Sequence, residues 1–247
     1  MSATNVIRTT RIAPHPAHDG AGNASWYRSE PTTSIERVVE PDDRLIMAHD
    51  PCDPRCERIR ALRTELLLRS EPTDRADIVA LVSPCAGEGR SMLAADLAIA
   101  FAQTGRPTLL VDADLRRPQQ QMLFGTDNRV GLTQAIESGD EPQLRSVFGL
   151  PRMSLLTAGE MPSDPLELLS SRNFAAMIED WRDNFKFVVI DTAPVAHFSD
   201  ALAVANLVGR VLVLSRAQHT PSREMRNMLR RLAATRSEIL GAVISHF

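Results

Sequence analysis

Residues 83–91 read Ser83-Pro84-Cys85-Ala86-Gly87-Glu88-Gly89-Arg90-Ser91 and separate two segments of different character. The apolar run Ile78–Val82 precedes them, and an Ala- and Leu-rich segment follows from Met92 onward. A strand, a glycine-bearing turn and a helix in this order place backbone N–H groups and the positive end of a helix around an anion. The sequence therefore predicts a phosphate-binding loop, with an ordinary glycine-rich turn as the alternative.

The loop fits the P-loop template G-x-x-x-x-G-K-[ST] with two differences. Gly89 and Ser91 match, whereas Pro84 stands at the first glycine and Arg90 replaces the lysine. Gly87 and Gly89 let the backbone approach a phosphate closely, and Ser91 places a hydroxyl where P-loops bind Mg²⁺. We expect the phosphate contacts to come from Gly87, Glu88, Gly89, Arg90, Ser91 and Met92.

The composition indicates one large α/β domain with a core of aliphatic side chains. The chain has 247 residues, of which 43% are hydrophobic and only 4% aromatic. A net charge of −3 gives no bulk attraction to nucleic acid or to an anionic membrane surface. No apolar run approaches the roughly 18 residues of a membrane span, and three cysteines are too few for a disulfide framework. We expect a cytoplasmic protein with no nucleic-acid partner and no direct membrane insertion.

The chain divides into a polar N-terminal part and an ordered remainder. Residues 1–44 carry scattered Pro, Gly, Ser, Thr and Asn without a sustained period, which predicts a disordered tail. Residues 45–247 form the expected domain. It begins with a helix over residues 54–70, where Pro54 precedes good helix formers.

Strands and helices alternate along the rest of the domain. Apolar runs without alternation are typical of a parallel sheet that is covered on both faces, and helices of ten or more residues between strands favour that fold. The expected strands are residues 78–82, 108–112, 153–157, 187–190, 211–215 and 239–245. We therefore predict an α/β fold whose mainly parallel sheet has helices on both faces, a P-loop NTPase of the MinD/ParA-like class.

Polar clusters follow three of these strands. They are residues 83–91, 112–118 and 191–194, and the last begins with an acid after four apolar residues, as in a Walker B motif. Ligands of such sheets bind beyond the carboxyl ends of the strands, so the three clusters should meet there. This coincidence strengthens the prediction of a nucleotide-phosphate site.

With these motifs the sequence resembles the bacterial tyrosine kinases of the P-loop type, cytoplasmic kinases of capsule and exopolysaccharide loci. The resemblance covers about residues 45–247. It rests on Gly87-Glu88-Gly89-Arg90-Ser91, Val111-Asp112-Ala113-Asp114-Leu115-Arg116-Arg117-Pro118, Pro165-Leu166-Glu167-Leu168-Leu169-Ser170-Ser171, Ile190-Asp191-Thr192-Ala193-Pro194, Ser199-Asp200-Ala201 and Glu57-x-x-Arg60-x-x-Arg63.

The resemblance implies a role for each matching residue. Arg90 stands where the phosphate-contacting lysine sits, and Ser91, Asp114 and Asp191 would surround Mg²⁺ directly or through water. Asp112 would accept or orient the proton of the tyrosine hydroxyl, so the implied catalytic residues are Asp112, Arg90 and Asp114. A helix N-cap after a strand is the alternative for the two acids in residues 112–114. Glu57, Arg60 and Arg63 would make intersubunit contacts in a ring-like homo-oligomer.

Three departures from the family pattern bear on activity. The family's substrate is a C-terminal cluster of tyrosines, but Tyr27 is the one tyrosine of this sequence, so Tyr27 or a partner would accept phosphate. Arg90 is planar and forked where lysine is compact; a lost transition-state contact of about 3 kcal/mol would slow transfer about a hundredfold. Ser245 replaces an asparagine near the base, which bears on adenine selectivity.

Three functions follow from these observations. The first is an ATP- and Mg²⁺-dependent tyrosine kinase of exopolysaccharide synthesis or export, docked on the cytosolic segment of a membrane chain-length regulator and so recruited to the inner face of the membrane. The second is a nucleotide-dependent assembly switch of the same system with weak or no catalysis. The third is a MinD/ParA-type positioning ATPase, which Arg116-Arg117-Pro118 fits poorly.

Overall fold

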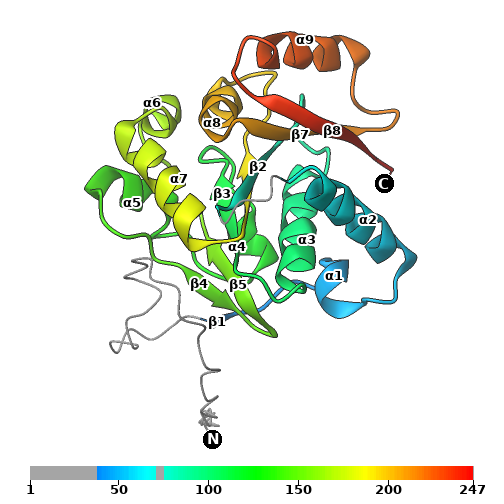
Figure 1. Cartoon of the computed structure of the whole chain (residues 1–247). Coiled ribbons are helices and arrows are strands. Elements are labelled where there is room, and N and C mark those ends of the chain that lie inside the picture. The colour runs from blue at the N-terminus through cyan, green and yellow to red at the C-terminus, as the bar shows by residue number, and fades with distance from the viewer. Residues whose placement is uncertain (1–37, 71–74, 247) are drawn as a thin grey trace, which may run out of the picture. The chain divides into compact units, whose positions relative to one another are not determined.

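The computed structural model describes residues 38–70 and 75–246. The strands of this part of the chain form a single mixed sheet (Figure 1). Its spatial order is β1-β4-β5-β3-β6-β2-β7-β8. Neighbouring strands are parallel except for the antiparallel pair β4 and β5. The strands are β1 (Val38–Val39), β2 (Asp77–Val82), β3 (Thr108–Ala113), β4 (Arg145–Val147), β5 (Leu150–Leu156), β6 (Phe187–Thr192), β7 (Arg210–Arg216) and β8 (Glu238–Ser245).

Helices cover both faces of this sheet. Helix α3 packs on one face with α1 and α2 beside it, and α8 packs on the other face with α6, α7 and α9 against it (Figure 1). The helices are α1 (Ile46–His49), α2 (Pro54–Leu68), α3 (Arg90–Ala102), α4 (Gln120–Leu123), α5 (Leu132–Ser138), α6 (Pro165–Leu169), α7 (Arg172–Asn184), α8 (Asp200–Val208) and α9 (Ser222–Leu232). The predicted covered, mainly parallel sheet is confirmed.

The central strands are buried on both faces, as their unbroken apolar runs predict. Within β2, Val79 and Leu81 join the core cluster that includes α3, while Ile78 and Ala80 are buried as well. The ring of Phe101 stacks on Phe187 with centroids 4.3 Å apart, which fixes the end of α3 against β6. Burial on both sides explains why these strands show no alternation of apolar and polar residues.

The N-terminal edge of the sheet begins earlier than predicted. Residues 38–44 belong to the segment expected as a disordered tail, yet Val38–Val39 form β1 beside β4, and Val39 is buried. The Val39 carbonyl also accepts the N–H of Phe148 at 2.8 Å. A two-residue strand has no period that a sequence can display, so only the pairing partner reveals it. The rest of the expected tail, including Tyr27, lies outside the described residues.

The order of the strands brings three carboxyl ends together. Strand β6 lies between β3 and β2, and Asp191 of β6 is in register with Asp112 of β3 and with Leu81 of β2. The loop after β2 leads directly into α3. The polar clusters that follow these strands therefore share one edge of the sheet.

None of the helices within residues 38–70 and 75–246 is both long enough and apolar enough to cross a membrane.

A buried acid ties the N-terminal helices to α3. Asp96 of α3 is 4% exposed, and its Oδ1 accepts the N–H of Met47 in α1 at 3.1 Å. Burial raises the pKa of this carboxyl to about 6, although the Met47 hydrogen bond opposes the rise. The folded protein therefore binds a proton at Asp96 more tightly than the unfolded chain does.

Asp96→Asn should stabilise the protein at neutral pH. Because the folded pKa is raised, the stability linked to this group is full below about pH 4 and is lost as pH rises through about 6. The amide oxygen of asparagine can still accept the Met47 N–H without a buried charge. Urea unfolding should show a gain on the order of 2 kcal/mol at about pH 7.5 and little change at about pH 4. Equal effects of Asp96→Asn and of Asp140→Asn, at an exposed position, would contradict this account.

Candidate active site

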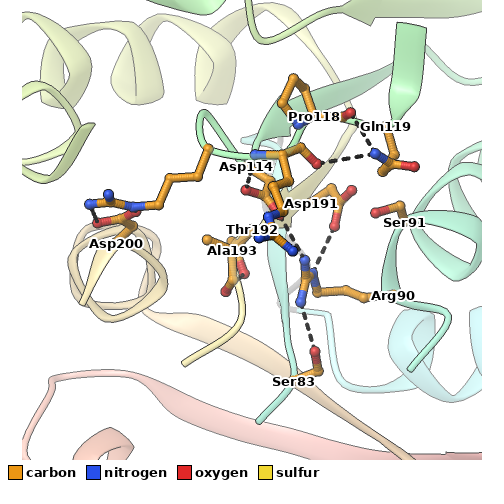
Figure 2. Close-up of polar contacts among 12 residues, drawn as sticks. Ser83, Arg90, Ser91, Asp114, Pro118, Gln119, Asp191, Thr192, Ala193 and Asp200 are labelled. Atoms are coloured by element: carbon orange, nitrogen blue, oxygen red, sulfur yellow. Dashed lines mark hydrogen bonds and ion pairs between the residues drawn. The ribbon is translucent and has the colours of Figure 1, made fainter. Parts of the chain in front are cut away.

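The predicted phosphate loop lies between β2 and α3 at the shared edge of the sheet (Figure 2). Gly87 and Gly89 adopt φ values of 75° and 87°, in the left-handed region that favours glycine. Gly89 is the N-cap of α3, so the helix begins at Arg90 with its first N–H groups at the loop. The local geometry is that of an anion-binding strand–loop–helix unit.

Arg90 points into the site and contacts the acids at the ends of β3 and β6. Its side chain is 7% exposed. The guanidinium donates from Nε to Asp191 Oδ1 at 2.9 Å and from Nη2 to Asp114 Oδ2 at 3.1 Å. Nη1 donates to Ser83 Oγ at 2.7 Å (Figure 2). One arginine thus links the loop, β3 and β6.

Asp112 is fully buried, and its carboxylate fixes the backbone that follows β3. Oδ1 accepts the N–H of Asp114 at 3.1 Å, and Oδ2 accepts the N–H groups of Gln119 and Gln120, each at 2.9 Å. Burial raises the pKa of Asp112, and the neighbouring Asp191 raises it further. The hydrogen bonds from Gln119 and Gln120 to Asp112 lie at the start of α4. They resemble the helix N-cap that is the alternative to a catalytic role for this acid.

Asp114 lies between the guanidinium and its own loop. Its Oδ1 accepts the N–H of Arg117 at 3.0 Å, while Oδ2 faces Arg90. Burial raises the pKa of Asp114, and the positive charge of Arg90 opposes that rise. The ion pair therefore favours the ionised form of an acid that burial alone would neutralise.

Gln120 belongs to the site although the sequence analysis did not identify it. It is fully buried, and its Nε2 donates to Asp191 Oδ2 at 3.0 Å and to the Ser91 carbonyl at 3.0 Å. Within the described residues its Oε1 has no hydrogen-bond partner. The only signal in the sequence is its place two residues after Pro118. That position does not reveal where the side chain points.

Glu88 joins the phosphate loop to the C-terminal part of the sheet. Its carboxylate is buried, accepts the N–H of Cys85 at 3.1 Å and accepts the hydroxyl of Thr220. Its carbonyl accepts the hydroxyl of Ser245 at 3.0 Å. Ser245, at the position where the resemblance leads us to expect asparagine, therefore contacts the loop directly.

Another buried acid near this edge is paired with a different arginine. Asp200, at the start of α8, is paired with Arg116 through both carboxylate oxygens. The Arg116 guanidinium also lies over the ring of Phe198, 4.0 Å from its centroid. Arg116 is thus committed to α8, whereas Arg90 serves the phosphate loop.

The donor set of the site suits a hard divalent cation. Mg²⁺ prefers oxygen ligands, and Ser91, Asp114 and Asp191 offer a hydroxyl and two carboxylates. The Oε1 of Gln120, which has no hydrogen-bond partner among the described residues, is a further buried oxygen on a side chain that contacts Asp191. No cluster of three or more His, Cys, Asp and Glu side chains disposed around a metal occurs in residues 38–70 and 75–246. A metal would therefore need oxygens from outside that set, such as Ser91 or a bound phosphate.

The three residues expected at a subunit interface lie on α2. Glu57 is exposed and paired with Arg60, and Arg60 also donates to the Pro51 carbonyl at 2.9 Å. Arg63 donates to the Ala100 carbonyl of α3 at 2.7 Å. Ala100 is near the end of α3, while the phosphate loop is at its beginning, so these residues are separate from the acids.

Removing the Gln120 amide should weaken the fold. Gln120→Leu keeps the size of the side chain but leaves Asp191 Oδ2 without its donor in a fully buried position. We expect a loss of about 1–3 kcal/mol in the free energy of unfolding, measured with urea. Gln119→Leu is the matched control at an exposed neighbouring position, with an effect within about 0.5 kcal/mol. If both variants are equally stable, the Gln120 contacts do not hold Asp191.

Known proteins of similar sequence are bacterial tyrosine-protein kinases. No protein-family model matches the chain. The tyrosine-protein kinase YwqD of Bacillus subtilis (strain 168) is 32% identical over 203 residues, which cover 81% of this chain and 85% of YwqD. The tyrosine-protein kinase Etk of Escherichia coli (strain K12) is 30% identical over 81% of this chain, which spans only 28% of Etk.

Solved structures give the same result. The kinase domain of Etk superposes with a TM-score of 0.78 and 28% identity, covering 87% of this chain and 84% of that domain. The chimerical protein CapA2B2 superposes with a TM-score of 0.76 and 30% identity, covering 85% of this chain and 93% of that chain. The fold is thus that of a P-loop NTPase, and the chain belongs to the family of bacterial tyrosine-protein kinases.

Proposed function

We propose that the chain binds ATP and Mg²⁺ and transfers a phosphoryl group to tyrosine. The observation that carries this proposal is the meeting of three groups at one edge of the sheet: the phosphate loop, Asp114 and Asp191. Phosphoryl transfer depends on positioning and charge neutralisation rather than on covalent chemistry by the protein. A cluster of this kind is what such a reaction needs.

The loop residues would hold the phosphates of ATP. The N–H groups from Gly87 to Met92 surround the start of α3, where the helix dipole favours negative charge. In this proposal Arg90 turns from the carboxylates toward a phosphate, which its forked guanidinium can bind with two hydrogen bonds. Glu88, bonded to Thr220, keeps the loop in place.

Mg²⁺ would be held by Ser91, Asp114 and Asp191, directly or through water. When bound, the ion neutralises phosphate charge as it develops in the transfer. Asp112 would orient or accept the proton of the tyrosine hydroxyl. The raised pKa of Asp112 brings a carboxyl closer to the range in which it can exchange a proton near neutral pH.

The proposed setting is the synthesis or export of exopolysaccharide or capsule. The chain would act in the cytoplasm and dock on the cytosolic segment of a membrane chain-length regulator, which recruits it to the inner face of the membrane. Exposed Glu57, together with Arg60 and Arg63, would contact a neighbouring subunit of a ring-like homo-oligomer. Tyrosines of the partner, or Tyr27 of this chain, would receive the phosphate.

A nucleotide-dependent assembly switch is the second candidate. Arg90 occupies two of the carboxylates that catalysis requires, and the sequence holds a single tyrosine. In this alternative, nucleotide binding changes assembly with the partner, and little or no phosphate is transferred.

A phosphorylation assay separates the two candidates. The purified chain is incubated with labelled ATP, Mg²⁺ and the cytosolic segment of the partner, and label on tyrosine is measured. We expect Asp112→Asn to lower the labelling at least a hundredfold, because the group that orients the hydroxyl proton is lost. The matched control is Asp96→Asn, the same change at a buried acid outside the site, which should keep wild-type labelling.

The outcomes assign the function. Tyrosine label that disappears in Asp112→Asn but persists in Asp96→Asn supports the kinase. Tight ATP binding without label above the Asp112→Asn level would overturn the kinase proposal and favour the switch.

A further inference from the structure

The two acids at the ends of β3 and β6 are already fully engaged by groups of the chain itself. Asp191 receives Arg90 at Oδ1 and Gln120 at Oδ2. Asp114 receives Arg117 N–H at Oδ1 and Arg90 at Oδ2. Each of the four carboxylate oxygens thus has a hydrogen-bond donor, and both acids are buried.

Arg90 binds one carboxylate oxygen of each acid, Asp114 Oδ2 and Asp191 Oδ1. The guanidinium bridges Asp114 Oδ2 and Asp191 Oδ1, which is the position from which a single cation neutralises both carboxylates. A divalent ion held between these two acids would compete with Arg90 for the same two negative charges. Two cations between the same pair of carboxylates in a buried site would repel each other strongly. Arg90 and Mg²⁺ therefore exclude each other there.

The arginine is held in this position by its shape as well as by its charge. All three guanidinium nitrogens donate, and the third bond goes to the buried hydroxyl of Ser83 at 2.7 Å. Lysine offers a compact ammonium on a flexible stem and cannot reproduce a planar fork with three fixed directions. The difference from the P-loop template at residue 90 therefore has a structural consequence beyond phosphate contact.

We propose that Arg90 is a built-in cation of this site, which occupies the divalent-ion position between Asp114 and Asp191 whenever no nucleotide draws it away. The nucleotide-free chain then does not bind Mg²⁺ at these carboxylates, because the ion can reach them only after Arg90 moves. Only the choice of Mg²⁺ as the competing ion rests on the proposed function.

The test asks whether Mg²⁺ can replace the missing charge of Arg90 and restore thermal stability, and it is carried out without ATP. Thermal unfolding of the wild type, Arg90→Gln and Arg116→Gln is followed in chelator and in Mg²⁺, with ionic strength matched by KCl. Breaking a buried ion pair should lower the Tm of Arg90→Gln by roughly 10 °C. Mg²⁺ should restore at least about half of that loss while moving the wild-type Tm by less than about 1 °C.

Arg116→Gln is the matched control. It also removes an arginine from a buried aspartate, Asp200, at the same end of the sheet, but Arg116 bridges no second acid by an ion pair within the described residues. Its Tm should fall and stay low in Mg²⁺. Arg90→Lys covers the case in which Arg90→Gln does not fold, because an ammonium retains charge but loses part of the fork; a partial gain in Tm from Mg²⁺ is expected.

Two results would overturn the proposal. One is a rise in the wild-type Tm with Mg²⁺ as large as that of Arg90→Gln, which would mean that Arg90 does not hold the ion's position. The other is no gain from Mg²⁺ in either Arg90 variant. Since ATP is absent throughout, an inactive kinase would not change these results, and a failure of the proposed function is recognised separately by the labelling assay.

Discussion

The ion pairs between one buried arginine and two buried aspartates determine how the carboxyl edge of the sheet is organised. Carboxylates are costly to bury unless they are paired and hydrogen-bonded. Asp114 and Asp191 meet this condition through the guanidinium of Arg90, and Gln120 supplies a further donor. The charge of Arg90 opposes the rise in the pKa of Asp114 that burial causes, and so favours the ionised form of that acid.

Two further sets of hydrogen bonds hold the groups around these ion pairs. On one side, Asp112 binds the backbone N–H groups that shape the turn from β3 into α4, which places Gln120 beside Asp191. On the other side, Glu88 bonds to Thr220 and Ser245, so the phosphate loop is attached to the segments around β7 and β8. A loop held by these Glu88 contacts keeps its N–H groups in place, and such preorganisation favours electrostatic catalysis.

Much of the fold could be predicted from the sequence because the central strands are buried on both faces. The expected strand at residues 78–82 became β2, and the Ala- and Leu-rich segment expected to be a helix from Met92 onward became α3. The meeting of Arg90, Asp114 and Asp191 was also foreseen, since parallel strands place their carboxyl ends at one edge.

What the sequence could not provide was the direction of individual side chains. The template assigns Arg90 to a phosphate, but its contacts to Asp191 span 101 positions of the chain and follow from the packing of β6 against β2 and β3. Gln120 has no motif of its own. The strand at Val38–Val39 is too short to show a sequence period, and its formation depends on pairing with β4.

A double-mutant cycle between Arg90 and Asp191 tests the central claim most directly. The free energies of unfolding of Arg90→Gln, Asp191→Asn and the double variant are measured in urea without divalent ions. If the pair balances buried charge, the double variant should be more stable than the sum of the single losses predicts, with a coupling of about 2 kcal/mol or more. Losses that add within about 0.5 kcal/mol would show that Arg90 does not neutralise Asp191.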